Sequence, residues 1–259
     1  MAYIKEYWTD KDQRADWALN HTNYMEANYH EEIKAAVRDT ITYSPEFVCN
    51  KKITNKETQI IICDMDSVGA VLNFGTGGRA AVLNFSSYLS PGGRFIDGSK
   101  AQEECLCHES FLYNVLKRIP EFYAWNAQHK NRALYLNRGL YTYNVKFERE
   151  KENCWCDVIT CAAPNKSAAQ KLCSISDSWN KRVLESRIKF VLDIAKDNGV
   201  NTLILGAYGC GVFGQDPIEV ASIFKNLLQT THKCFETVVF AIPNGRDGNL
   251  EQFRKVFKN

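Results

Sequence analysis

The sequence predicts an α/β fold in which helices cover both faces of a central sheet. Short apolar runs alternate with helical segments over most of the 259 residues. These runs are continuously apolar rather than alternating, which is typical of strands buried on both faces. Glycine-rich loops directly follow two of the runs, and ligands bind beyond the carboxyl ends of strands in such sheets.

Helical periodicity and capping residues define the elements of the first half. Ile33, Ala36 and Val37 fall on one side of a helix, and Asp66 or Ser67 can cap the start of another. A helix should end before Pro120, because the residue preceding a proline disfavours helical geometry. The predicted elements are a helix over 29–42, a strand over 59–63, a helix beginning within 66–72, a strand over 80–85 and a helix over 103–118.

The second half continues the alternation. Gly199 is placed to close a helix, and Asp216 to cap another helix whose first position is Pro217. The polar and aromatic segment 123–152 is only weakly periodic, and we expect a hairpin or a long loop near the site. The remaining predicted elements are a strand over 157–165, a helix over 179–198, a strand over 201–206, a helix over 216–231, a strand over 237–242 and a helix over 249–258.

Composition argues against several classes of protein. The formal net charge of +2 implies no strong field toward nucleic acid or an acidic membrane, and no apolar run approaches the roughly 18 residues of a membrane helix. The N-terminal segment shows no secretory signal, so we expect a cytoplasmic protein with reduced thiols. Cys105 and Cys107, like Cys154 and Cys156, are poorly spaced for zinc. We therefore expect neither a metal ion nor a bound cofactor.

The loop after the second predicted strand carries the most informative pattern. Pro91-Gly92-Gly93 leads to the adjacent carboxylates Glu103 and Glu104, which open a helix. Glycines let backbone N–H groups approach an anionic ligand closely, and neighbouring carboxylates suit acid/base work or hydroxyl recognition beside it. The combination suggests hydrolysis of a nucleotide-like sugar bond. The alternative is a pair of solvated glutamates favoured by the helix dipole.

This stretch resembles the signature of the microbial-type poly(ADP-ribose) glycohydrolases, a branch of the macrodomain superfamily. That signature consists of three glycines, a short spacer and Gln-Glu-Glu, which Gln102, Glu103 and Glu104 match. Two positions depart from it. Arg94 stands where the third glycine would be, and Ser90 stands where the family usually has asparagine before Pro-Gly.

A second glycine-rich loop follows the strand predicted over 201–206. Its Gly209-x-Gly211-x-x-Gly214 pattern is a weak dinucleotide fingerprint. The remaining chain is too short for further βαβ units, so a nicotinamide dehydrogenase is disfavoured and a phosphate clamp at a helix N-terminus is favoured. The loop also resembles the diphosphate loop of macrodomains, which runs through Gly-Cys-Gly-Val-Phe to Asp-Pro.

The resemblance implies roles for these residues. Glu104 would be the acid/base, Glu103 would hold ribose hydroxyls and Gln102 would support the loop. Phe213 would lie against the distal ribose, and its alternative role is that of a buried loop anchor. The ligand-binding residues implied are Asn84, Pro91, Gly92, Gly93, Gln102, Gly206, Gly209, Cys210, Gly211, Val212 and Phe213.

The resemblance also implies a fold, an activity and a partner. The expected fold is a three-layer α/β/α macrodomain-like mixed sheet over 56–259, with 1–55 as a helical N-terminal extension packed on it. The expected activity is an ADP-ribosyl glycohydrolase that cleaves the ribose anomeric bond of poly- or mono-ADP-ribosylated substrates. The expected partner is ADP-ribose or an ADP-ribosylated protein, and the expected state is a monomer.

Two alternative functions stay open. One is a hydrolase of arginine-linked mono-ADP-ribose without polymer activity, and the other is a reader that binds ADP-ribose without turnover. Arg94 bears on the first alternative, since its side chain could pair with the diphosphate, point outward or narrow the site around the leaving group.

Overall fold

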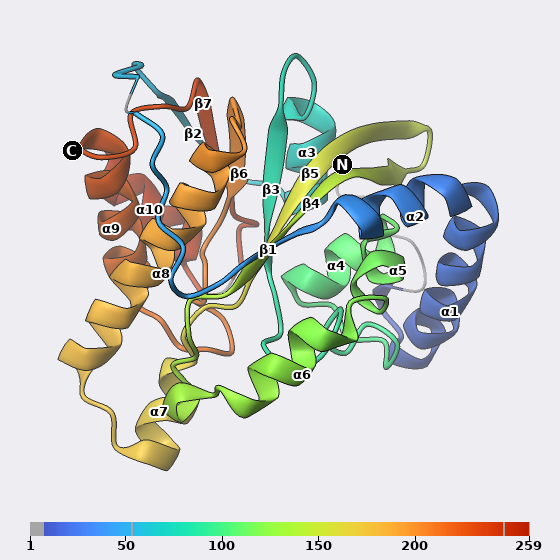
Figure 1. Ribbon diagram of the computed structural model, residues 1–259, viewed down its shortest axis with the longest axis horizontal. Coiled ribbons are helices and arrows are strands. Elements are labelled where there is room, and N and C mark those ends of the chain that lie inside the picture. The colour runs from blue at the N-terminus through green and yellow to red at the C-terminus, as the bar shows by residue number, and fades with distance from the viewer. Residues whose placement is uncertain (1–7, 53, 246, 259) are drawn as a thin grey trace.

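A seven-stranded sheet with helices on both faces is the framework of the computed structural model, which describes residues 8–52, 54–245 and 247–258 (Figure 1). In spatial order the strands are β1 (Ile41–Tyr43), β4 (Gly139–Arg149), β5 (Glu152–Cys161), β3 (Ala80–Phe85), β6 (Thr202–Leu205), β7 (Thr237–Ala241) and β2 (Gln59–Cys63). The neighbouring strands from β5 to β2 pair in parallel. At the other side of β5, β4 pairs antiparallel with β5, and the edge strand β1 pairs antiparallel with β4. The predicted α/β class and mixed sheet are confirmed.

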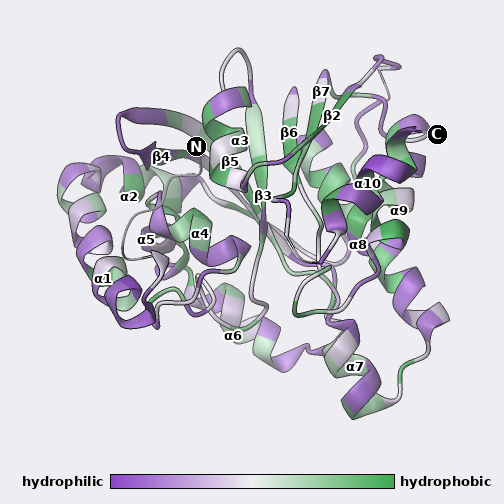
Figure 2. Ribbon diagram, turned by 180° about the vertical axis from the view of Figure 1, so that it is seen from behind, coloured by the Kyte–Doolittle hydropathy of each residue, from purple (hydrophilic) through white to green (hydrophobic). Residues whose placement is uncertain are grey.

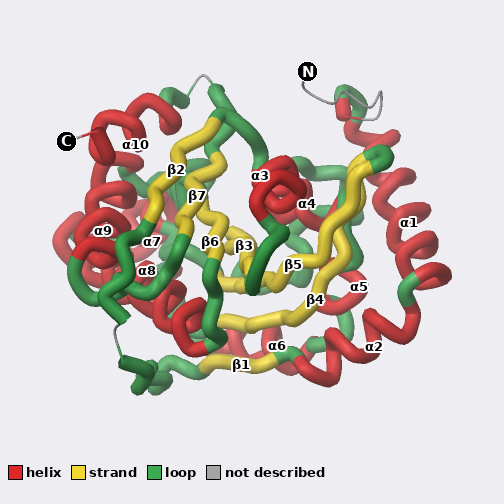
Figure 3. Tube along the Cα trace, turned by 90° about the horizontal axis from the view of Figure 1, so that it is seen from above, coloured by secondary structure: helices red, strands yellow, loops and turns green. Residues whose placement is uncertain are grey.

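Two groups of helices cover the faces of the sheet, as Figure 3 shows from above. One face carries α1 (Lys11–Asn28), α2 (His30–Asp39), α3 (Ser67–Phe74), α4 (Gln102–His108), α5 (Leu112–Leu116) and α6 (Pro120–Gln128). The other carries α8 (Asp177–Asp197), α9 (Pro217–Gln229) and α10 (Asn249–Lys258), with α7 (Lys166–Cys173) in a small separate cluster.

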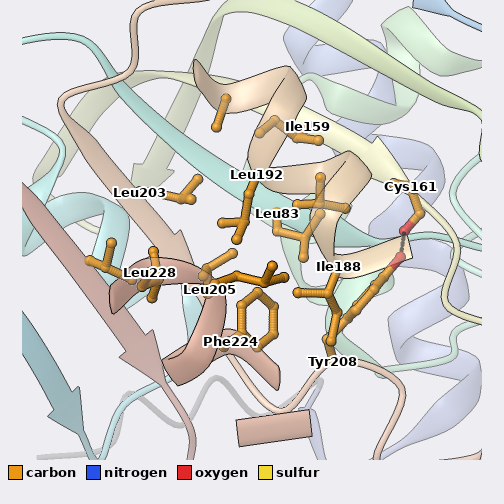
Figure 4. Packing of buried hydrophobic residues seen from close by; sticks show 14 of the residues in the cluster. Leu83, Ile159, Cys161, Ile188, Leu192, Leu203, Leu205, Tyr208, Phe224 and Leu228 are labelled. Carbon is orange, nitrogen blue, oxygen red and sulfur yellow. Dashed lines mark hydrogen bonds between the residues drawn. The ribbon is translucent and has the colours of Figure 1, made fainter. Parts of the chain in front are cut away.

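The central strand β3 separates two hydrophobic cores, because successive side chains of a strand point to opposite faces. Ala81 and Leu83 belong to the core under α8 and α9, and Val82 belongs to the core under the other helices. Figure 4 shows the first of these cores around Leu83, and in Figure 2 hydrophobic residues gather on strands such as β2 and β7.

Most predicted elements and their caps are confirmed. The Asp66 side chain accepts a hydrogen bond from the N–H of Gly69 at the start of α3, and Asp216 accepts one from Glu219 at the start of α9. Gly199, with a φ of +67°, follows the end of α8. In the same way α2, β2, β3, β6, β7 and α10 match the ranges predicted for them within a few residues.

The single long helix predicted over 103–118 is wrong, because tertiary pairing breaks it after α4. Ser110 forms an isolated antiparallel bridge with Phe147, and the Glu109 carbonyl accepts a hydrogen bond from the N–H of Glu148. Ser110 then caps the N–H of Leu112 at the start of α5. A further helix, α6, begins at Pro120, where the sequence predicted only an end.

Three further differences concern the segments around the predicted strands. A hairpin or a long loop was expected within 123–152; β4 lies there and pairs with β5. The strand predicted over 157–165 is present as the second half of β5, which begins at Glu152 and ends at Cys161. Neither β1 nor α7 was predicted. The N-terminal region does contain two helices, yet β1 makes part of it an edge of the sheet, and residues 1–7 and 53 of the predicted extension lie outside the described residues.

Membrane-spanning helices and metal-binding clusters are both absent from the described ranges. No helix there is long and apolar enough to cross a membrane, and no three histidine, cysteine, aspartate or glutamate side chains lie together as a metal site would require.

Candidate active site

Two glycine-rich loops leave the same edge of the sheet. The strands that precede them, β3 and β6, are parallel neighbours that pair directly through Ala80 and Thr202. The first loop, residues 86–101, leads into α4, and the second, residues 206–216, leads into α9. Both lie toward the lower edge of Figure 1. The convergence of these loops follows from parallel pairing, as the sequence predicted.

The Glu103 side chain is buried, and the protein holds both of its carboxylate oxygens. Oε1 accepts a hydrogen bond from Nδ2 of Asn84 (3.1 Å), and Oε2 accepts one from the N–H of Ser87 (2.6 Å). Burial raises the pKa of Glu103 to about 8; these two hydrogen bonds oppose the rise, and the Glu104 charge adds to it. Glu103 is therefore mostly protonated at neutral pH.

Glu104 is held differently, through one oxygen. Its Oε1 accepts a hydrogen bond from the N–H of Arg94 (2.9 Å), whereas its Oε2 accepts none from the part of the chain that the structure describes. Gly92 and Gly93 have φ values of +65° and +62°. A Cβ on Gly93 would lie 2.5 Å from Oε1 of Glu104 and 3.1 Å from Oε2 of Glu103. The turn therefore packs against both carboxylates and tolerates only glycine at this position.

Gln102 fixes the end of β3 to the start of α4. Its Oε1 accepts a hydrogen bond from the N–H of Phe85 (2.8 Å). Its Nε2 donates to the carbonyl of Leu83 (2.8 Å) and to Oγ of Ser67 (3.0 Å). Both ends of the Gln102 amide thus bond to the protein and tie β3 to α4.

Asn84 is completely buried behind Glu103. Its Nδ2 donates to Glu103 and also lies 3.3 Å from Oγ1 of Thr160. The structure therefore places Asn84 as a support for the glutamate. Ser87, whose N–H holds the same carboxylate, was not predicted, and its only signal in the sequence is its place just after the strand.

The Arg94 side chain points away from the glutamates. Its side chain is 71% exposed, and Nε donates to Oδ2 of Asp97 at 3.0 Å. Its φ lies outside the left-handed region that glycine favours, so a residue with a Cβ fits where the signature has its third glycine. Of the three orientations considered for Arg94, the structure shows the outward one, and its contribution to the site is its backbone N–H.

The second loop turns on glycines that pack against the protein. A Cβ on Gly206 would lie 2.7 Å from the carbonyl of Ala241, and one on Gly209 would lie 2.9 Å from Cβ of Ala163. Gly211 differs, because no heavy atom lies within 4 Å of the position a Cβ would occupy. Gly211 therefore faces open space, as expected for a backbone that a ligand approaches.

The tip of the second loop presents free N–H groups. Those of Gly211, Val212 and Phe213 donate to no acceptor among the described residues, and Val212 is 85% exposed. Consecutive free N–H groups of this kind can cradle an anion. Phe213 is half-buried and packs against the core, as a loop anchor does. Burial raises the pKa of the half-buried Cys210 thiol to about 12.

Tyr208 anchors this loop in the core below. It is completely buried, and its hydroxyl donates to the carbonyl of Cys161 at 2.9 Å (Figure 4). Its ring packs edge-on against Phe85 at the end of β3. The base of the second loop is thereby fixed to β5 and β3.

The stability of Glu103→Gln relative to wild type is expected to increase as pH rises. The raised pKa of Glu103 means that the folded state binds more protons than the unfolded state between about pH 4.5 and 8. The free energy of unfolding of the wild type therefore falls through this window. A neutral amide removes that loss, so the stability difference should grow by about 2 kcal/mol or more between pH 5 and pH 9. Urea denaturation at several pH values measures it.

Glu46→Gln, at an exposed position, is the control for this pH series. It removes one carboxylate without removing a buried one, so its stability difference should stay nearly constant. If the stability difference between Glu103→Gln and wild type were also constant with pH, Glu103 would not be a buried, mostly protonated carboxyl.

Comparison with known proteins gives a matching family model and similar folds. A family model described as the catalytic domain of microbial-type PARG, poly(ADP-ribose) glycohydrolase, matches residues 17–150. No curated protein sequence matches significantly. The structure of poly(ADP-ribose) glycohydrolase from Thermomonospora curvata is 29% identical with a TM-score of 0.86, covering 95% of this chain and 100% of that one.

Two ligand-bound structures are also similar. The Thermomonospora curvata enzyme bound to the inhibitor ADP-HPD is 29% identical with a TM-score of 0.83, covering 94% of this chain and 99% of that chain. The poly(ADP-ribose) glycohydrolase from Deinococcus radiodurans in complex with ADP-ribose is 29% identical with a TM-score of 0.81, covering 87% and 97%.

Proposed function

The chain belongs to the family of microbial-type poly(ADP-ribose) glycohydrolases, and from this membership we propose that it hydrolyses the glycosidic bonds of ADP-ribose polymers. One observation supports the proposal most directly. The Glu104 carboxylate is fixed through Oε1 by the Arg94 N–H, while its Oε2 makes no hydrogen bond to a described residue. One oxygen thus orients the group, and the other is available to a substrate.

Glu104 can serve both halves of the reaction. The bond between the ribose anomeric carbon and the leaving oxygen breaks through an oxocarbenium-like state, and Glu104 in its protonated form donates its proton to that oxygen. A water then attacks the anomeric carbon and returns a proton to Glu104. Glu103, which is mostly protonated and held on both oxygens, suits the recognition of ribose hydroxyls and adds little negative charge near Glu104.

The second loop supplies a place for the diphosphate. The N–H groups of Gly211, Val212 and Phe213 donate to no described acceptor, so they can donate to phosphate oxygens without breaking an existing hydrogen bond. This loop and the glutamates leave the same edge of the sheet, one strand apart. That arrangement fits one ADP-ribose unit bound across both loops.

Gly211→Ala is expected to weaken the binding of ADP-ribose about tenfold or more, with an unchanged melting temperature. The position is open and has no left-handed φ, so the folded chain accepts a methyl group there. Only a ligand that approaches the backbone closely would clash with this methyl group. A clash that costs about 1.4 kcal/mol lowers the affinity tenfold. Isothermal titration calorimetry measures the affinity.

Gly78→Ala is the matched control, since Gly78 also lacks a left-handed φ but lies in the loop before β3, at the other end of the sheet. It should bind ADP-ribose like wild type. Wild-type affinity in Gly211→Ala would count against a diphosphate at this loop.

The outward Arg94 bears on the choice between polymer and single-unit substrates. Its side chain is exposed and paired with Asp97, so it does not narrow the site around the leaving group. This orientation gives no support to an enzyme restricted to arginine-linked mono-ADP-ribose. Polymer cleavage is the activity that the family membership favours.

The experiment that tests the function is the release of ADP-ribose from a panel of substrates. Purified protein is incubated with poly(ADP-ribosyl)ated protein and with mono-ADP-ribosylated proteins carrying arginine or acidic linkages. Fast release from the polymer supports the proposal. Release only from mono-ADP-ribosylated arginine would establish the narrower hydrolase, and ADP-ribose binding without any release would establish a reader.

We further propose that the protein is a cytoplasmic monomer of the macrodomain superfamily that acts on ADP-ribosylated proteins. Its net charge of +2 supports the absence of direct nucleic-acid or membrane binding. Sedimentation of the purified protein tests the monomer.

A further inference from the structure

The segment that joins α6 to β4 has an unusual backbone. Asn131, Arg132, Ala133 and Tyr135 have φ values of 43°, 54°, 65° and 61°, although none is glycine. A side chain with a Cβ disfavours this left-handed region. Such strain persists only where the surroundings fix the backbone, and it concentrates at ligand-binding sites. The segment, which the sequence pattern left unassigned, therefore needs an explanation.

Several buried contacts hold this turn in place. Leu134 is completely buried in the small cluster beside α7. Its carbonyl accepts a hydrogen bond from Nη2 of Arg187 (3.4 Å), whose side chain is also completely buried. The carbonyl of Ala133 accepts one from the N–H of Asn165 (3.0 Å), at the start of α7. The strained geometry is thus fixed from both sides.

The turn places the Tyr135 ring between the two glycine-rich loops. The ring stacks on Tyr88 with centroids 4.1 Å apart and an interplanar angle of 13°. It also meets Phe213 edge-on, with centroids 6.3 Å apart. Tyr88 belongs to the loop that leads to the glutamates, and Phe213 belongs to the tip that presents free N–H groups. Tyr135 is therefore a bridge between the loops.

We propose that Tyr135 is a positioning residue for ADP-ribose, and this inference rests on the proposed function. Tyr88 is buried, and its carbonyl accepts a hydrogen bond from Nδ2 of Asn126, so it offers a fixed surface. The backbone of the tip at 211–213 is held through two carbonyls, since Phe213 accepts from the N–H of Ser167 (3.1 Å) and Gly211 from that of Gly214 (2.9 Å), while its three N–H groups donate to no described residue. Stacked on Tyr88, the Tyr135 ring holds Phe213, and with it the tip, at a set distance from the glutamates. Ordering the tip before the ligand arrives reduces the entropy lost on binding.

Three variants separate the ring from the strain of the backbone. Tyr135→Phe keeps the ring and should bind ADP-ribose within about twofold of wild type. Tyr135→Gly removes the ring and relieves the left-handed φ, and it should bind about tenfold more weakly. Ala133→Gly relieves the strain alone, so it should raise the melting temperature and leave the affinity unchanged. Tyr135→Leu replaces the glycine variant if that does not fold.

The measurements are calorimetric titration with ADP-ribose, the melting temperature, and kcat and KM on the polymer. A positioning role predicts a raised KM with kcat largely retained, and full rescue by phenylalanine. Wild-type affinity in Tyr135→Gly, or in Tyr135→Leu where the glycine variant does not fold, would overturn the inference alone. A wild-type protein that binds no ADP-ribose would overturn the proposed function and this inference with it.

Discussion

Glu104→Gln is expected to lower kcat for polymer cleavage by about 10³-fold while ADP-ribose still binds. The amide oxygen can accept the hydrogen bond that the Arg94 N–H now donates to Oε1, so the side chain keeps its orientation. What the variant loses is the proton that the leaving oxygen needs and the base that accepts one from water. Single-turnover release from the polymer measures the rate, and calorimetry measures ADP-ribose binding.

Glu46→Gln serves again as the control, because it makes the same chemical change at an exposed position far along the chain from the motif. It should cleave the polymer at the wild-type rate. Near wild-type turnover by Glu104→Gln would show that another group transfers the proton, and Glu103 would then be the first to examine.

Gly93→Ala is expected to lower kcat/KM by about 10²-fold or more and to destabilise the fold by roughly 1–3 kcal/mol. Its Cβ would lie 2.5 Å from Oε1 of Glu104, so the carboxylate must move from the Arg94 N–H. The residue would also hold a φ of +62°. Activity is measured at a temperature where the variant is folded, and stability by urea denaturation.

Gly199→Ala is the control that measures the stability lost through a left-handed φ alone. Gly199 has a φ of +67°, and no atom lies within 4 Å of the Cβ position. It should lose about 1 kcal/mol of stability through strain and keep full activity. If Gly93→Ala lost only as much stability and kept its activity, the turn would not hold the carboxylates.

The sequence predicted elements whose signals are local. Asp66, Asp216 and Gly199 act on the backbone within a few residues, and the structure confirms all three. The convergence of the two loops was also predictable, because it follows from alternating strands and helices. The glutamate motif and the second loop could thus be assigned to one edge of the sheet from the sequence alone.

Features that depend on distant contacts were not predictable. The break after α4 arises because Ser110 pairs with Phe147, which follows it by 37 positions along the chain. Helical periodicity continues across this point, so no local signal marks the break. The left-handed backbone at Ala133 and Tyr135 is equally hidden, since neither residue type favours it. The orientation of Arg94 required knowledge of its φ and of its pairing with Asp97.

The two glycine-rich loops leave one end of the sheet, so the opposite end offers a place to attach another molecule away from the glutamates. The loop between α3 and β3 lies at the end of β3 opposite the glutamates (Figure 1), and no atom lies within 4 Å of the Cβ position of Gly77. An inserted peptide tag, fluorophore or whole domain would leave from this loop without passing either glycine-rich loop. The enzyme could therefore be tethered to a bead, a sensor or a chosen cellular structure with its substrate-facing edge still open.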